Sequence, residues 1–219
     1  NAAGNSTGTV IEAGGVANAT AGTPSTAGTL SIVDADQNQS SFQAVTPASL
    51  NGTYGSFTFN NATGAWTYTL DNSKAATQGL TAGQIVHDTL TVTSLDGTAS
   101  KAIDVTITGA NDNAAITGTA TGSVTEDVAV SSGNLTTSGT LTVSDVDSGE
   151  AVFQTPATLN GTYGTFTFNT STGAWTYSAN NSQAAIQALG ANDKLTDSIT
   201  VVSKDGTASQ AITVTINGT

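Results

Sequence analysis

The chain contains one sequence unit twice, and this duplication constrains its fold more than any other feature. The segment "NGTYGSFTFNNATGAWTY" (51–68) returns as "NGTYGTFTFNTSTGAWTY" (160–177), with 15 of 18 positions identical at an offset of 109 residues. Two further pairs of segments recur in the same order: 27–36 with 138–147, and 96–109 with 205–218. A fixed period of this length indicates tandem copies of one structural unit. We therefore predict two domains, residues 1–112 and 113–219.

Apolar and polar residues alternate along short segments of each copy, which is typical of half-buried β-strands. In the second copy the inward positions are Leu141, Val143, Phe166, Phe168, Trp175, Tyr177, Ile199, Val201, Ile212, Val214 and Ile216. The segments "NTSTG" (169–173) and "DGTA" (205–208) are typical of hairpin turns. The segment "SQAAIQALG" (182–190) predicts one short helix, capped by Ser182 and ended by Gly190. We predict an all-β fold of two tandem immunoglobulin-like β-sandwiches, with about seven strands each.

The charge of the chain excludes several classes of partner. Sixteen acidic residues face four lysines, there is no arginine, and the net charge is −12. Nucleic-acid binding requires clustered basic side chains, so neither nucleic acid nor an anionic membrane surface is an expected partner. The chain has no apolar run of transmembrane length, so we expect no direct membrane insertion. The absence of cysteine excludes disulfides and thiolate chemistry.

The acidic residues concentrate at positions that the topology brings together. Seven strands would leave the two ends of a domain at opposite poles, so that copies stack head to tail with residues 109–116 at the joint. The loops of the second copy that face this joint, and the end of the first copy, carry carboxylates. We expect up to seven of them at one joint: Glu12, Asp88, Asp112, Asp145, Asp147, Glu150 and Asp205.

Such a cluster requires a counter-ion, and Ca²⁺ suits it best. Two carboxylates about 4 Å apart repel by roughly 1 kcal/mol in water and by more when they are partly buried. Calcium takes about six to eight oxygen ligands from carboxylates, Asn side chains and backbone carbonyls. Magnesium prefers to keep its waters, and zinc favours Cys or His, of which the chain has only His87. The alternative interpretation is that these Asp and Asn residues serve as turn formers.

Several short motifs of the second copy resemble the calcium motifs of cadherins. They are "VTED" (124–127), "DVD" (145–147), "DGT" (205–207) and "GANDN" (109–113). The segment "GTLTVSDVDSGEAVFQTPATLNGTYGTFTFNTSTGAWTY" is similar to the VCBS repeat of giant secreted bacterial adhesins of the RTX type. The resemblance covers nearly the whole chain, twice. It implies cadherin-like sandwiches that extend an adhesive tip away from the cell envelope.

The resemblance also implies a set of calcium ligands. At the joint these are Glu12, Asp88, Asn111, Asp112, the carbonyl of Asn113, Asp145, Asp147 and Asp205. Glu126 and Asp197 would serve the next joint, and Asp34, Asp36 and Asp96 the preceding one. The chain departs from the cadherin pattern at Ala114, where a proline is usual, and at "HD" (87–88), which replaces an Asp-x-Glu pair. Glu150 has no clear counterpart in the first copy.

We therefore expect a calcium-rigidified spacer, the extender of a long adhesin involved in cell adhesion and biofilm formation. The protein would be extracellular, on a bacterial cell surface, and secreted by a type I system. Its partners would be neighbouring repeats of the same chain, and weak lateral self-association is left open. The alternative is a module that binds a sugar or another protein. A third class, an enzyme, finds no support, because the single histidine, His87, is replaced by Thr196 in the second copy.

Overall fold

The computed structural model describes residues 2–14, 21–35 and 39–219. The chain divides into two units, Asn1–Asp112 (unit 1) and Asn113–Thr219 (unit 2). Within the described ranges, each unit contains seven strands in two sheets, four strands in one and three in the other. The prediction of an all-β fold with two sandwich domains is confirmed.

In unit 1 the four-stranded sheet has the order β1-β3-β5-β4, and the three-stranded sheet has the order β2-β7-β6. The strands are β1 (Ala2–Gly4), β2 (Thr7–Ile11), β3 (Ser25–Ile32), β4 (Gly55–Phe59), β5 (Ala65–Leu70), β6 (Ile85–Thr93) and β7 (Ser100–Thr108). A 3-10 helix, η1 (Pro47–Leu50), precedes β4, and the one-turn helix α1 (Ala75–Gln78) connects β5 to β6. The first strand thus changes sheets, since β1 pairs with β3 and β2 pairs with β7.

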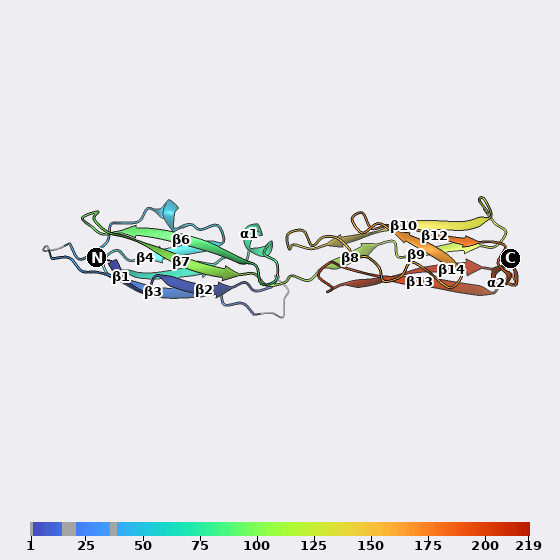
Figure 1. Ribbon diagram of the computed structural model, residues 1–219, viewed down its shortest axis with the longest axis horizontal. Helices are drawn as coiled ribbons and strands as arrows, with labels where there is room; N and C mark the ends of the chain where they lie inside the picture. Colours follow the sequence, from blue (N-terminus) through green and yellow to red (C-terminus); the bar gives the residue numbers. More distant parts are fainter. Residues whose placement is uncertain (1, 15–20, 36–38) are drawn as a thin grey trace. The chain divides into compact units, whose positions relative to one another are not determined.

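Unit 2 repeats this topology, with sheets in the orders β11-β12-β10-β8 and β13-β14-β9 (Figure 1). Its elements are β8 (Ala115–Gly118), β9 (Thr121–Thr125), β10 (Asn134–Ser144), β11 (Gly164–Phe168), β12 (Ala174–Asn180), α2 (Ala184–Gln187), β13 (Lys194–Val202) and β14 (Ser209–Asn217). The turns predicted at 169–173 and 205–208 connect β11 to β12 and β13 to β14.

The chain enters and leaves each unit at opposite ends. In unit 1, β2 runs parallel to the last strand β7, with Thr7 opposite Asp104 and Ile11 opposite Thr108. In unit 2, β9 runs parallel to β14 in the same way. Because the first and last strands point in one direction, each unit has an N-terminal pole, where its first strand begins, and a C-terminal pole, where its last strand ends.

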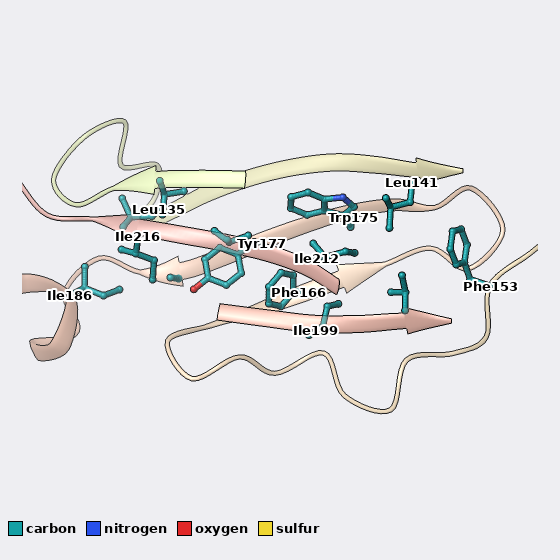
Figure 2. Close-up of a cluster of buried hydrophobic side chains, with 14 of the residues drawn as sticks. Leu135, Leu141, Phe153, Phe166, Trp175, Tyr177, Ile186, Ile199, Ile212 and Ile216 are labelled. Atoms are coloured by element: carbon teal, nitrogen blue, oxygen red, sulfur yellow. The ribbon is translucent and has the colours of Figure 1, made fainter. Parts of the chain in front are cut away.

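The core of each unit lies between its two sheets. Figure 2 shows the core side chains of unit 2 pointing into this space from both layers. Trp175 and Tyr177 are at most 1% exposed, and Phe153 packs edge-on against Phe168 with ring centroids 5.0 Å apart. The predicted inward residues are all buried, except that Phe168 is partly exposed. Alternation predicted the core correctly because side chains alternate between the two faces of a strand.

The predicted helix is shorter than its sequence segment and has a different cap. Helix α2 covers only four residues, its N-cap is Gln183, and it has no side-chain cap. Ser182 instead donates its hydroxyl to Asn180 Oδ1 at 2.8 Å. The prediction of Ser182 as the cap is therefore wrong, because the hydroxyl is already engaged in the turn that follows β12.

Candidate metal centre

Three carboxylates meet at the N-terminal pole of unit 2. Asp145 and Glu150 lie on the loop after β10, and Asp205 lies in the turn between β13 and β14. One oxygen from each lies within 4.8 Å of the other two, and all three side chains are half-buried. Two loops that are 55 or more positions apart in sequence thus form one acidic cluster, Asp145, Glu150 and Asp205, which we call the unit 2 cluster.

Local hydrogen bonds fix the two loops that carry the cluster. Asp145 Oδ1 accepts the amide of Asp147 at 2.9 Å, so the "DVD" segment forms a tight turn in which Asp147 is buried. Asp205 accepts the hydroxyl of Ser203 at 2.5 Å, and both the amide, at 3.2 Å, and the hydroxyl of Thr207. The hydroxyl of Thr207 also accepts the amide of Ala114 at 2.8 Å, which joins this turn to the start of the unit.

The electrostatics of the cluster favour a cation. Burial raises the pKa of Asp145, and the nearby charge of Asp205 raises it further, although the amide of Asp147 opposes this shift. Asp145 Oδ2 is buried, and among the described residues it has no hydrogen-bond partner. All three side chains offer only oxygen, which suits Ca²⁺ better than a metal that prefers nitrogen or sulfur. The residues present therefore fit a calcium ion.

The N-terminal pole of unit 1 carries the corresponding acids Asp34, Asp36 and Asp96. Asp34 is half-buried, and Asp36 lies outside the described residues. Asp96 is exposed and accepts the hydroxyls of Ser94 and Thr98, each at 2.5 Å. These hydrogen bonds, first that of Ser94, lower the pKa of Asp96 to about 2. The Asp96 carboxylate is therefore stabilised in its charged form by hydroxyl groups.

At the C-terminal pole of unit 1, Glu12 is fully buried at the end of β2. Its amide donates to the carbonyl of Thr108 at 3.0 Å. Its carboxylate accepts the side chain of Gln78 and the amide of Ala110, each at 3.2 Å. Glu12 thereby ties the end of β2 to the segment after β7.

The segment after β7 carries the predicted linker ligands. Asn111 and Asp112 are the last two residues of unit 1, and Asn113 is the first residue of unit 2. The side-chain amide of Asn111 donates to the carbonyl of Asp112 at 2.7 Å. The convergence of Glu12, this linker and the unit 2 cluster at one joint stays a prediction.

Glu126 occupies the place of Glu12 in unit 2. It is 4% exposed, its amide donates to Asn217, and its Oε1 accepts the amide of Thr219 at 3.1 Å. Its Oε2 is buried and lacks a hydrogen-bond partner among the described residues. Gln187 corresponds to Gln78 of unit 1, which donates to Glu12. The Gln187 side chain donates to Asp127 at 3.1 Å and not to Glu126, because unit 2 has an aspartate where unit 1 has Ala13.

Asp88 does not fit the role of ligand that the sequence suggested. It lies within β6, and its carboxylate accepts the amides of Thr53, Tyr54 and Gly55 at 2.8–3.1 Å. It also accepts the hydroxyl of Tyr68 at 2.7 Å. These bonds hold the "NGTYG" turn and engage both oxygens, so we leave Asp88 out of the proposed ligands.

Asp197, which was expected to serve the next joint, makes the same contacts in unit 2. It accepts the amides of Thr162, Tyr163 and Gly164 and the hydroxyl of Tyr177. Gly161 leaves the room for this arrangement, because a Cβ there would clash with the Asp197 carboxylate. Burial and the adjacent carboxylates raise the pKa of both Tyr68 and Tyr177, so these phenols remain neutral donors.

A family model described as the bacterial cadherin-like domain matches the sequence twice, at residues 1–109 and 111–218. The chain belongs to this family. Cadherin-like domains are extracellular modules of structure and adhesion, they are typically not enzymes, and they generally bind calcium. No helix in the described ranges is long and apolar enough to cross a membrane.

No curated protein matches this cadherin-like chain, whereas several solved structures do. A protocadherin gammaB7 EC3-6 cis-dimer structure is 16% identical with a TM-score of 0.46, and the match covers 100% of this chain and 48% of that one. A protein of unknown function from Porphyromonas gingivalis W83 is 7% identical with a TM-score of 0.34, and the match covers 99% and 98%. An I-band fragment of titin is 11% identical with a TM-score of 0.33, and the match covers 99% and 65%. The chain spans about half the length of the protocadherin chain.

Proposed function

We propose that the two cadherin-like units are spacer repeats of a long bacterial surface adhesin of the VCBS and RTX type, stiffened by calcium at the joint. The observation that carries the proposal is the placement of acidic side chains at opposite poles of the unit. Buried Glu12 lies at the C-terminal pole of unit 1, and the unit 2 cluster lies at the N-terminal pole of unit 2. The linker Asn111–Asp112–Asn113 connects these two poles in the chain.

The proposed mechanism is electrostatic. Without a cation the carboxylates at the joint repel one another, and the short linker acts as a hinge. The side chains that would bind calcium are Glu12, Asn111, Asp112, Asp145, Asp147 and Asp205, together with the carbonyl of Asn113. Calcium bound by these residues would supply positive charge, and the ligands of both units could then approach one another. The joint then becomes stiff, and the repeats hold an adhesive tip away from the cell.

The cellular setting follows from the expected affinity. Extracellular calcium modules have dissociation constants of about 0.1–1 mM, so their sites fill outside the cell and stay empty in the cytosol. We propose that the repeats leave the cell in the hinged state, through a type I secretion system, and stiffen on the surface. The role of the assembled adhesin would be cell adhesion and biofilm formation.

Small-angle scattering of the full chain tests the proposal. The radius of gyration and maximum dimension are measured in 2 mM Ca²⁺ (about twofold above the weakest expected dissociation constant) and in EGTA. We expect a longer, narrower particle in calcium for the wild-type chain, and no calcium response for Asp112→Asn. The control is Asp193→Asn, an exposed aspartate at the C-terminal pole of unit 2. An equally loose hinge in calcium and in EGTA would refute the rigid joint.

A second candidate function is binding of a sugar or another protein on the outer sheet faces. These faces carry rows of hydroxyls, such as Thr58 and Thr67 with Oγ1 atoms 2.7 Å apart, and Thr167 and Thr176 at 2.6 Å. Hydroxyl rows can hydrogen-bond to a glycan. A glycan array and a partner screen separate the two functions, since a pure spacer binds nothing specifically.

A further inference from the structure

We propose that Asn51 and Asn160 are sites of spontaneous deamidation, and that the folded turn after each asparagine keeps this modification slow. Both residues open the repeated segment "NGTYG", so each is followed directly by a glycine. Both are exposed to solvent. The inference goes beyond the proposed function and needs neither calcium nor the joint. It makes deamidation a covalent mark of units in which the turn has opened.

The reaction requires only the chain and water. The backbone nitrogen of the glycine attacks Cγ of the preceding asparagine, so that a C–N bond forms and closes a five-membered succinimide ring. The bond from Cγ to the side-chain nitrogen breaks, and this nitrogen takes up the proton of the glycine amide and leaves as ammonia. Water then opens the ring to aspartate or to isoaspartate, which has one more carbon in the main chain. Glycine favours the attack, because it has no side chain and its backbone turns freely.

The fold requires the glycine of each pair. In unit 2 the Asp197 carboxylate accepts the amides of residues 162–164, and a Cβ on Gly161 would overlap this carboxylate. In unit 1, Asp88 and Gly52 have the same relation. Only glycine fits at these two positions. The turn that stabilises each unit therefore also contains a dipeptide that is prone to deamidation.

The closed turn withholds the attacking nitrogen. The N–H of Gly52 donates to the carbonyl of Gly55 at 2.9 Å, and the N–H of Gly161 donates to the carbonyl of Gly164 at 2.8 Å. Attack requires this bond to break and the nitrogen to lose its proton near a carboxylate, whose negative charge opposes the loss. Deamidation therefore proceeds from the locally opened turn. Isoaspartate lengthens the main chain at this point, so the modified turn cannot close as before.

Mass spectrometry of the full chain, incubated at mildly alkaline pH with and without urea, tests the inference. Cleavage after the four lysines places Asn51, Asn160 and the third Asn–Gly pair, Asn217–Gly218, in three different peptides. In urea we expect deamidation at all three asparagines. In the native chain we expect Asn51 and Asn160 to react at least about tenfold more slowly, because only the opened fraction reacts. Unmodified Asn51 and Asn160 in urea would overturn the sites, and equal rates with and without urea would overturn the protection by the turn.

Two matched variants of the native chain test the role of the turn. Tyr177→Phe removes the hydroxyl that donates to Asp197 and keeps the buried ring. We expect deamidation of Asn160 to become about tenfold faster, since a hydrogen bond to a charged group stabilises the closed turn by that factor or more. Asn51 is the internal control, and its rate should stay within about twofold. Tyr68→Phe should give the reverse pattern.

Asn217 separates opening of the turn from unfolding of unit 2. It is the last residue of β14, and the N–H of Gly218 donates to the carbonyl of Asp193 at 3.0 Å. In Tyr177→Phe we expect the deamidation rate of Asn217 to stay within about twofold. A rise equal to that at Asn160 would mean that the whole unit unfolds, and it would overturn the gating by the turn. An unchanged rate at Asn160 in the same variant would also overturn it.

Discussion

Aspartates of this chain differ in role according to the donors around them. Asp197 faces three consecutive backbone amides and a phenol, which together act as a preformed anion site within unit 2. Asp145 faces other carboxylates, and one of its oxygens is buried without a donor. The first arrangement satisfies the carboxylate within the fold, whereas the second calls for a cation.

At this scale we predict that Asp197→Asn destabilises unit 2 by about 3 kcal/mol or more. Hydrogen bonds to a charged group contribute about 1.5–3 kcal/mol each, and the new amide turns a donor toward other donors. Urea unfolding monitored by tryptophan fluorescence measures the loss, and Asp88→Asn should have the matching effect on unit 1. Asp104→Asn is the control, because its exposed pair with His87 should contribute less than about 1 kcal/mol. If Asp197→Asn lowered the free energy of unfolding no more than Asp104→Asn, the stabilising role of the Asp197 hydrogen bonds would be contradicted.

Among the elements, the first strand of each unit is held where it changes sheets. The indole of Trp66 donates to the carbonyl of Asn5 at 2.8 Å, and the indole of Trp175 donates to Thr119 at the same distance. Asn5 and Thr119 lie between the two halves of the first strand, after β1 in unit 1 and after β8 in unit 2. In both copies, a core tryptophan thus also holds the crossover of the first strand in place.

We predict that Gly139→Ala destabilises unit 2 by about 1–3 kcal/mol, since overpacking in a well-packed site costs this much. A Cβ at Gly139 would lie 2.7 Å from the Trp175 ring, so the ring or the strand must move. Urea unfolding measures the change. Thr140→Ala on the outer face of the same strand is the matched control and should stay within about 0.5 kcal/mol. Equal stability of Gly139→Ala and wild type would show that the ring has room to move.

The strands and cores of both units could be predicted from sequence, but two finer features could not. Period-2 alternation is a local property, so it located Phe166 and Tyr177 in the core without knowledge of their partners. The cap of α2 was predicted wrongly, because Ser182 bonds to Asn180 rather than to the helix. The crossover after β8 was not predicted, because it depends on a hydrogen bond between residues 56 positions apart.

At the scale of the whole molecule, the net charge of −12 means that acidic side chains repel one another in the folded state. Calcium binding reduces this repulsion, so we expect calcium to raise the free energy of unfolding. At 2 mM free calcium, an ion that binds only the folded state with a dissociation constant of about 0.1–1 mM adds about 0.6–1.8 kcal/mol per site. We therefore predict that EGTA lowers the melting temperature and that excess calcium restores it. Differential scanning calorimetry in calcium, magnesium and EGTA checks this result. A melting temperature unchanged by chelation would count against calcium binding at the proposed joint.

The sequence by itself determined the duplication, the all-β class and the residues of the two cores, because these follow from repetition and from alternation along the chain. It also indicated which poles would be acidic. Only the tertiary structure decided what each acid does. Asp88 and Asp145 are the same residue type, but Asp88 meets amides from residues 53–55, whereas Asp145 meets Glu150 and Asp205. The role of a carboxylate depends on donors and charges that folding brings to it from distant parts of the chain.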